Sequence, residues 1–421
     1  MQTAEAQEPV SEASGQNEIA RGRLLTFGSL THAALAAGGV LPALCLVQIA
    51  EQFQLNDAQC GFFFAVSPTV TLFTLPVVGQ LSERWGKRGL LVAGMILLAI
   101  AMTCYRSADA YEVLLLGSTA LGLSCACVDA LVSPLLVDLF PTRNAPVMNL
   151  VHCCFQVGIV GTALVAGTFL AREGLWTNTF LPVTIVAAVV ALGFAVTRFP
   201  PALKHATPMR IGGLLSQGSF WLCMVVIAVA GGVEAGILVW VPTFLQRQFD
   251  MAATGVWLTE QLGLVDPEPL LGGIGLALFA APMVVGRWFY GSLAERCGYV
   301  AILMVSCVVS AVALVGLWWA STAATSIAWL ALLGLAMSGV WPTLLIYAAA
   351  IIQANPQTLF SLLAMAGLAG VGICSWGIGQ LAELSGDIHM GLCALLMPLA
   401  AALAALTALS RITPPATTPK H

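Results

Sequence analysis

Two carboxylates stand alone inside long apolar stretches of this sequence. Asp129 lies within the apolar run 112–139 and Glu234 within the run 217–248, and neither has a basic residue nearby in its run. An isolated charge is costly in apolar surroundings, so such a group tends to exchange its proton. We therefore predict that both carboxylates couple proton movement to the protein's activity. The alternative is that each is a buried acid held by a hydroxyl or backbone group for packing.

A polar stripe begins the apolar run 147–172. Asn149, His152 and Gln156 are spaced i, i+3 and i+7, so they share one face of a helix. The rest of the run is mostly Gly, Ala and Val, and the stripe must therefore face a cavity or another helix rather than lipid. His32 is the only histidine or charged residue in the run 24–50. It is a candidate for the same cavity, with a packing histidine as the alternative.

Three tryptophans fall inside apolar runs rather than at their ends: Trp240, Trp341 and Trp376. They could pack in a core or anchor in lipid, or they could form a platform on which a sugar ring or another flat solute stacks. We place them with the cavity residues. Pro342, which follows Trp341, is expected to break its helix locally because proline lacks the backbone N–H.

The composition places these residues in a membrane. The chain is 59% hydrophobic and only 9% charged, whereas about a quarter of the residues in a soluble protein are charged. A helix that crosses a bilayer needs about 20 mostly apolar residues. The runs of that kind are 24–50, 58–82, 88–106, 112–139, 147–172, 176–198, 217–248, 270–293, 299–320, 325–352, 357–383 and 386–410.

The only long break between these runs that is both basic and rich in proline divides them six and six. It contains three prolines and several basic residues. The sequence thus predicts an all-α membrane protein with two six-helix bundles. The expected divisions are a tail at 1–23, a first bundle at 24–198, a linker at 199–216, a second bundle at 217–410 and a tail at 411–421.

A charged segment recurs in the two halves. Residues 79–86 and 291–298 share the pattern Gly-x-Leu-x-Glu-Arg-x-Gly. The pattern is too charged for lipid, so it predicts a tight turn at the membrane surface, and its repetition predicts an internal duplication. We expect Asp138 to form a latch with Arg84, Lys87 or Arg143, and Arg287 to act at a helix end or latch rather than on substrate. The candidate gating residues are Gly79, Glu83, Arg84, Gly86, Arg88, Asp138, Arg287, Glu295 and Arg296.

The basic residues are distributed unequally between the two sides of the predicted membrane. With the N-terminus inside, twelve Lys and Arg residues fall on the cytoplasmic side and three on the other. The positive-inside rule then places both termini in the cytoplasm, in a plasma or inner membrane. Residues 1–20 are acidic and lack the positive region of a cleaved signal peptide. We expect them to form a disordered cytoplasmic tail.

Nothing in the sequence has the pattern of an enzyme. The 12 cysteines fall mostly inside apolar runs, without CxxC pairs or zinc spacing. No nucleophile–base or metal constellation is visible, so we expect neither catalysis nor a cofactor nor a bound metal. The net charge of −4 gives no reason to expect nucleic acid. The expected partners are a small-molecule solute, protons and the lipid bilayer, and we expect a monomer.

The repeated pattern resembles the loop between the second and third helices of major facilitator superfamily transporters. That loop reads Gly-x-Leu-Ala-Asp-Arg-x-Gly followed by two basic residues. Here Glu83 stands where Asp is usual, and the second copy lacks the basic pair. The resemblance implies two pseudo-symmetric bundles around a central cavity that opens alternately to either side.

Four shorter stretches resemble one branch of that superfamily, the fucose–galactose–glucose:proton symporters. The branch's Glu-x-x-x-Asn-Pro motif, whose Glu is implicated in proton coupling, is similar to Asp129-Ala-Leu-Val-Ser133-Pro134, which adds Ser133 to the cavity residues. The stretches similar to its fifth, seventh and eighth helices are Asn149-x-x-His152, Gly232-x-Glu234-x-Gly236 with Trp240, and Val285-Gly286-Arg287.

The resemblance implies proton-coupled symport of a sugar or a similar small polar solute by alternating access. Asp129 and Ser133 replace the branch's Glu and Asn, so the solute need not be a hexose. One alternative is an exporter or facilitator of another small organic molecule. The other is a membrane sensor that binds a solute without transporting it.

Overall fold

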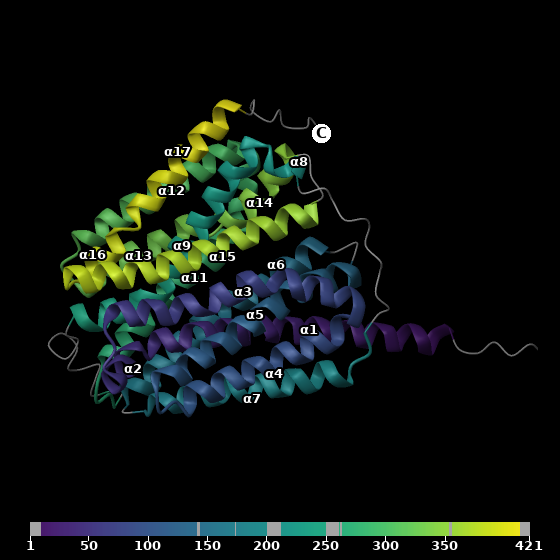
Figure 1. Ribbon diagram of the computed structural model, residues 1–421, viewed down its shortest axis with the longest axis horizontal. Helices are drawn as coiled ribbons and strands as arrows, with labels where there is room; N and C mark the ends of the chain where they lie inside the picture. The colour runs from purple at the N-terminus through teal and green to yellow at the C-terminus, as the bar shows by residue number, and fades with distance from the viewer. Residues whose placement is uncertain are drawn as a thin grey trace, which may run out of the picture.

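The structure is a computed structural model of the 421-residue chain. It describes residues 10–140, 144–172, 174–199, 212–249, 261, 263–352 and 356–412. The regular structure of these residues is helical, and twelve helical segments are long and apolar enough to cross a membrane. They coincide with the twelve runs predicted from the sequence, so the all-α membrane fold is confirmed (Figure 1).

The helices form two bundles. The first half contains α1 (Val10–Leu44), α2 (Leu46–Phe53), α3 (Asp57–Trp85), α4 (Lys87–Arg106), α5 (Tyr111–Leu139), α6 (Asn144–Ala171), the 3-10 helix η1 (Trp176–Phe180) and α7 (Leu181–Val196). The second half contains α8 (Gly212–Leu215), α9 (Gly218–Gln248), α11 (Glu268–Cys297), α12 (Tyr299–Trp318), α13 (Ala323–Met337), α14 (Val340–Ile351), α15 (Pro356–Ser385), α16 (Ile388–Cys393) and α17 (Leu396–Ile412). Each half surrounds a buried apolar cluster that is made mostly of its own residues.

The repeated charged segment forms a turn of a single residue in each half. Gly86 separates α3 from α4 with φ 78° and ψ 162°, and Gly298 separates α11 from α12 with φ 91° and ψ 139°. Residues other than glycine rarely adopt this backbone conformation. The sequence predicts a turn over the whole pattern. The structure instead continues α3 and α11 as helices up to the last glycine of each copy.

Two helix boundaries differ from the sequence prediction. Helix α1 begins at Val10, so part of the tail that we expected to be disordered is helical. The first apolar run also ends at Leu44, and a separate short helix, α2, follows Cys45.

The predicted break in the tenth run is present. Helix α13 ends at Met337 and α14 begins at Val340. The backbone nitrogen of Pro342 has no hydrogen to donate to the carbonyl of Ser338 four residues earlier, which accounts for the interruption at this point.

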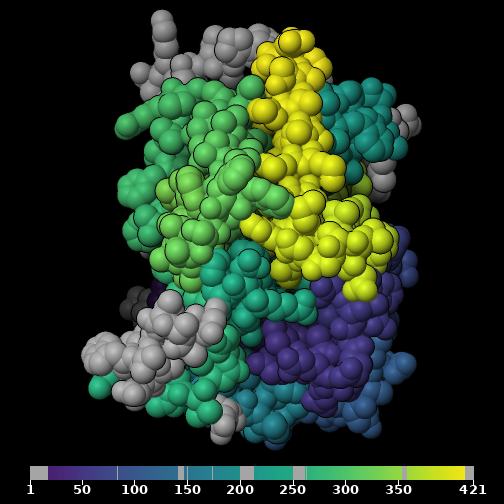
Figure 2. Space-filling view, turned by 90° about the vertical axis from the view of Figure 1, so that its left-hand side faces the viewer, coloured from purple at the N-terminus to yellow at the C-terminus, as the bar shows by residue number. Residues whose placement is uncertain are grey.

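The two halves meet closely at one end of the molecule. We call this end, which contains α2, η1 and α16, the closed end. We call the opposite end, which contains Gly86 and Gly298, the open end. The side chains of Asp57 and Arg247 form an ion pair of 2.8 Å between the halves, and the Asp57 backbone N–H donates to Glu383 at 3.1 Å. Figure 2 looks onto this end, where the purple helix α3 and the yellow-green helix α15 abut.

Glycines allow the halves to approach at the closed end. A Cβ on Gly379 would lie 2.4 Å from the carbonyl oxygen of Asp57, and one on Gly273 would lie 2.3 Å from that of Ala163. These contacts join α15 to α3 and α11 to α6. In Figure 1, α12 and α17 slope away from the first bundle toward the open end. The described contacts between the halves therefore hold the closed end together.

Candidate functional site

Two histidines from the first half come together within the membrane-spanning region. The rings of His32 on α1 and His152 on α6 meet edge to face with 5.6 Å between their centroids. His32 is buried, and its Nδ1 donates to the carbonyl of Gly28 at 3.1 Å. Close packing of the two helices makes this possible, because Gly158 lies directly against the backbone of Ala33. His152, unlike His32, is exposed.

A hydrogen bond crosses from this half to the other. Gln156, one turn after His152 on α6, donates its amide N–H to Glu234 on α9 at 3.4 Å. The Gln156 side chain is fully buried, and its carbonyl oxygen Oε1 has no hydrogen-bond partner among the described residues. A buried acceptor without a partner costs about 1–3 kcal/mol. This oxygen is therefore an unsatisfied acceptor next to Glu234.

Arg287 supplies positive charge to the same region. Its guanidinium on α11 interacts electrostatically with both Glu234 and His152. We expected Arg287 to act at a helix end or as a latch; it lies ten residues, about 15 Å, before the end of α11, so it is not at the helix end. Its Nε donates to the carbonyl of Ser338 at 3.1 Å. We refer to His32, His152, Gln156, Glu234 and Arg287 as the polar cluster.

Asp129 occupies a separate position in the first half. It is exposed, near the middle of the long helix α5. Cys125, one turn earlier on α5, interacts with Asp129 and contacts the hydroxyls of Ser67 and Thr71 on α3. Arg287 is not among the charges that act on Asp129. The two predicted proton-coupling residues thus lie in different surroundings, and only Glu234 belongs to the polar cluster.

The three tryptophans divide among different environments. Trp240 is fully buried in the core of the second half and donates its indole N–H to the carbonyl of Ser375 at 2.9 Å, so here it is a packing residue. Trp341 is half-buried and rests against Gly231 and Gly367. Since Gly231 precedes Glu234 by three residues on α9, the Trp341 indole lies one turn from the polar cluster. Trp376 is 45% exposed on α15.

Apart from Arg287, which belongs to the polar cluster, the candidate gating residues lie in the parts of α3, α4, α5 and α11 nearest the open end. Lys87 forms an ion pair with Asp138 within the first half, one of the three pairings expected for Asp138. Four of these gating residues are exposed: Arg84, Arg88, Glu295 and Arg296. Ser133 is partly buried on α5. The predicted roles of the Glu83 and Asn149 side chains fall outside the described part of the chain.

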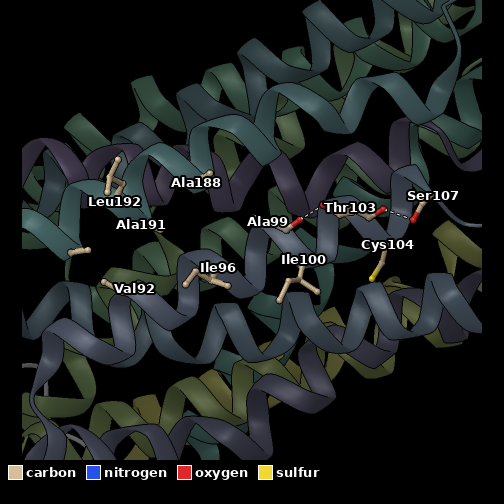
Figure 3. A pocket seen from close by; sticks show the side chains of 11 residues that line it. Val92, Ile96, Ala99, Ile100, Thr103, Cys104, Ser107, Ala188, Ala191 and Leu192 are labelled. Atoms are coloured by element: carbon tan, nitrogen blue, oxygen red, sulfur yellow. Dashed lines mark hydrogen bonds between the residues drawn. The ribbon is translucent and has the colours of Figure 1, made fainter.

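Two hollows on the surface differ chemically from the polar cluster. A groove of about 550 Å³ between α4 and α7 is lined by apolar side chains such as Ile96, Ile100 and Leu192 (Figure 3). The hydroxyls of Thr103 and Ser107 in this groove donate back to carbonyls of their own helix. A second hollow of about 710 Å³ lies against Trp318 and Trp319 at the closed end. Neither hollow contains a residue of the polar cluster.

Comparison with known proteins identifies the family. The model of the Major Facilitator Superfamily matches residues 26–265, more than half of the chain. The chain belongs to the major facilitator superfamily. The family resemblance seen in the repeated charged segment is thereby confirmed, and the protein is a transporter-family membrane protein of the multi-pass type. The resemblance to the fucose–galactose–glucose branch is not confirmed.

Relatives within the superfamily share modest identity with this chain. A Haemophilus influenzae protein whose name refers to metabolite transport is 25% identical over 276 residues, 60% of this chain and 62% of that protein. An uncharacterised MFS-type transporter of Yersinia pestis is 26% identical over 361 residues, 83% and 87% of the two chains. The purine ribonucleoside efflux pump NepI of Escherichia coli is 24% identical over 174 residues, 41% and 44%. The chain thus spans about three fifths of the Haemophilus protein and less than half of NepI.

Solved structures share the fold. A bacterial homologue of the human lysosomal transporter Spinster, in an inward-facing and occupied conformation, superposes with a TM-score of 0.74 at 16% identity, over 93% of this chain and 97% of that one. The nucleoside transporter NupG, as its D323A mutant, superposes with a TM-score of 0.76 at 10% identity, over 94% and 100%. At these identities the likeness concerns the fold alone.

The contacts of the closed end were not predicted from the sequence. Asp57, Arg247 and Glu383 lie at or just beyond the ends of three predicted membrane runs, all on the same side. Oppositely charged residues at such ends are candidates for ion pairs between the runs, because the sequence already predicts that these ends lie at one surface. The sequence does not reveal that the second, seventh and eleventh runs are neighbours there.

Proposed function

We propose that this protein moves a small polar solute across the membrane by alternating access, and that it couples this movement to protons in the same direction. The observation that carries the proposal is the polar cluster, which the two halves build together inside the membrane-spanning region. His32, His152 and Gln156 come from one half, and Glu234 and Arg287 from the other. A solute bound there contacts both halves, so its affinity depends on how they are arranged.

The solute class that we propose is a sugar or a similar neutral, hydroxyl-bearing molecule. Gln156 offers a buried acceptor, and Arg287 offers N–H donors in the same cluster as Glu234. A hydroxyl both donates and accepts hydrogen bonds, so a site with both kinds of partner favours a hydroxyl-bearing solute. The half-buried indole of Trp341 adds an apolar surface beside it.

The conformation supports an assignment of which side of the membrane the transport site opens to in this state. The halves are joined at the closed end by the Asp57–Arg247 ion pair and by close glycine contacts. The excess of basic residues at the open end places that end in the cytoplasm under the positive-inside rule. The structure would then be the inward-facing state. Protonation of Asp129 or Glu234 favours solute binding from outside, and deprotonation in this state accompanies release.

The proposal is tested with purified protein in liposomes that contain a pH-sensitive dye. The panel of solutes added outside consists of neutral sugars, ribonucleosides and charged metabolites of similar size. Acidification of the lumen by a neutral hydroxylated solute is the expected result, and it names the solute. Uptake of labelled solute without acidification would overturn proton coupling. Binding of a solute without any flux would identify a sensor instead of a transporter.

A second candidate function is export of a nucleoside. The observation that favours it is the relationship to purine ribonucleoside efflux pumps of several enteric bacteria. A ribonucleoside also presents hydroxyls and a flat ring, so the polar cluster does not separate it from a sugar. Vesicles with a reversed pH gradient distinguish export from symport, because an antiporter then accumulates the nucleoside while a symporter expels it.

A further inference from the structure

The break in the tenth membrane segment leaves one backbone carbonyl without its helical donor. In a continuous helix the carbonyl of Ser338 would accept from the backbone N–H of residue 342, but that residue is proline. Buried carbonyls are nearly always paired. Here the pairing comes from another helix, because the side-chain Nε of Arg287 donates to the Ser338 oxygen at 3.1 Å.

The break is seated on a single turn of α11. A Cβ on Gly286 would lie 2.3 Å from the hydroxyl oxygen of Ser338, and a Cβ on Gly339 would lie 2.0 Å from the ring of Tyr290. Gly286 therefore makes room for Ser338, and Gly339 makes room for Tyr290. Together with the Arg287 hydrogen bond, these contacts fix the break against residues 286–290.

The hydrogen bond at Nε restricts the orientation of the rest of the guanidinium. Arginine has five N–H donors in one rigid plane, so fixing Nε also fixes the direction of the two terminal nitrogens. No acceptor within the described residues pairs with those terminal nitrogens, while Glu234 and His152 lie within electrostatic range of the group. The terminal donors are thus held in a fixed plane within electrostatic range of the polar cluster.

We propose that Pro342 is a positioning residue for solute binding: by withholding a backbone N–H it reserves the Ser338 carbonyl for Arg287, which then presents its terminal N–H groups to an oxygen of the solute. The solute class is one with a hydroxyl or carbonyl oxygen as acceptor. This inference rests on the proposed transport of a polar solute through the polar cluster. It assigns a role to a proline that has no contact with the solute.

The test is a double-mutant cycle on transport by the full-length protein in liposomes. Pro342→Ala supplies the missing N–H, so the Ser338 carbonyl can close a continuous helix and Arg287 loses its anchor. We expect the KM for the transported solute to rise about tenfold, the loss typical of one hydrogen bond to a charged group, with a much smaller change in kcat. Arg287→Lys keeps the charge but removes Nε, and in that background Pro342→Ala should change KM little.

A matched control is available in α3. Pro76 also lies within a helix, but no described side chain donates to the carbonyl of Leu72, four residues earlier, so Pro76→Ala should leave KM unchanged. The inference is overturned if Pro342→Ala leaves KM unchanged, or if it raises KM equally with Arg and with Lys at position 287. Wild-type protein that transports no solute would instead contradict the proposed function.

A measurement that needs no solute distinguishes failure of this inference from failure of the proposed transport function. Arg287→Lys leaves the Ser338 carbonyl without its donor and should lower the midpoint of thermal unfolding in detergent. When Pro342→Ala is also present, the backbone satisfies that carbonyl, and the loss from Arg287→Lys should shrink. Additive losses would show that Arg287 and Pro342 do not act on the same carbonyl, and would overturn the inference whether or not transport is found.

Discussion

Glu234 has the surroundings of a residue that couples a proton to a solute. It shares the polar cluster with Arg287, and it accepts the amide N–H of Gln156 from the opposite half. Protonation would remove its charge and release Arg287 toward other acceptors. The carboxylate can therefore change the hydrogen-bonding capacity of the site without leaving it.

Glu234→Gln should separate transport from proton coupling. The amide keeps the size of the side chain and its ability to accept from Gln156, but it cannot release a proton. We expect proton-driven accumulation to fall by about 5–150-fold, the range of ordinary coupling between two ligands, while solute exchange across the membrane at equal pH persists. Both are measured in the same liposomes. Glu112→Gln, an exposed glutamate in the first turn of α5, is the control; accumulation that survives Glu234→Gln unchanged would exclude Glu234.

Asp129→Asn tests the second carboxylate independently. Asp129 is exposed near the middle of α5, and a carboxylate that faced lipid at that depth would cost several kcal/mol, so we infer that it faces water between the halves. If it carries the proton, the variant loses accumulation but retains exchange, whereas Asp109→Asn at an exposed loop position retains both. Proton-driven uptake that remains after both Asp129→Asn and Glu234→Gln would rule out the proposed mechanism.

The sequence anticipated some parts of this site better than others. The spacing of His152 and Gln156 predicts one helical face, because side-chain direction follows directly from helix periodicity. The pairing of His32 with His152 depends on how α1 crosses α6, which no local pattern encodes. The same holds for Trp240, whose burial reflects the packing of α9 against α15. Arg287 was placed too near a helix end because α11 continues to Cys297.

At the scale of elements, close crossings between the halves hold this conformation. Helix α6 meets α11 where the backbones of Ala163 and Gly273 are in contact, and Gly379 on α15 fits against Asp57 on α3. Small residues permit such approaches in membrane proteins. The twelve membrane runs were predictable because hydropathy is local. The crossings were not, because glycines at many positions of the sequence would permit them equally well.

Gly273→Ala should favour the conformation in which the closed end is open. The added methyl would lie 2.3 Å from the Ala163 carbonyl oxygen, and overpacking of this kind costs about 1–3 kcal/mol. An energy of that size raises the population of a minor state by about 5–150-fold. Cys60 is a native reporter of the change, because it is fully buried beside Asp57, Arg247 and Glu383.

The labelling of Cys60 by a membrane-impermeant maleimide, followed by peptide mass spectrometry, measures that opening. We expect faster labelling in Gly273→Ala than in the wild type. Gly161→Ala is the matched control on α6, because a Cβ at Gly161 would meet nothing within 4 Å. Equal labelling rates in all three proteins would show that this crossing does not hold the closed end shut.

At the scale of the whole molecule, the two halves repeat one plan. Each contains a pair of helices joined by a single glycine with positive φ, Gly86 in the first half and Gly298 in the second. Both glycines lie at the open end, together with the exposed charges of the repeated segment. The duplication fixes these two turns on the same side of the membrane. It does not say which side, and the proposed direction of transport depends on that.

Cys297 allows the orientation to be measured without engineering. It is the last residue of α11, immediately before Gly298, and of the 12 cysteines it is the exposed one. With the open end in the cytoplasm, an impermeant maleimide should label Cys297 rapidly in inside-out membrane vesicles and hardly at all in right-side-out vesicles, and Cys297→Ser should abolish the fast phase. The opposite result would place the open end outside. The conformation described here would then be outward-facing, and the solute would enter from the side to which we assign its release.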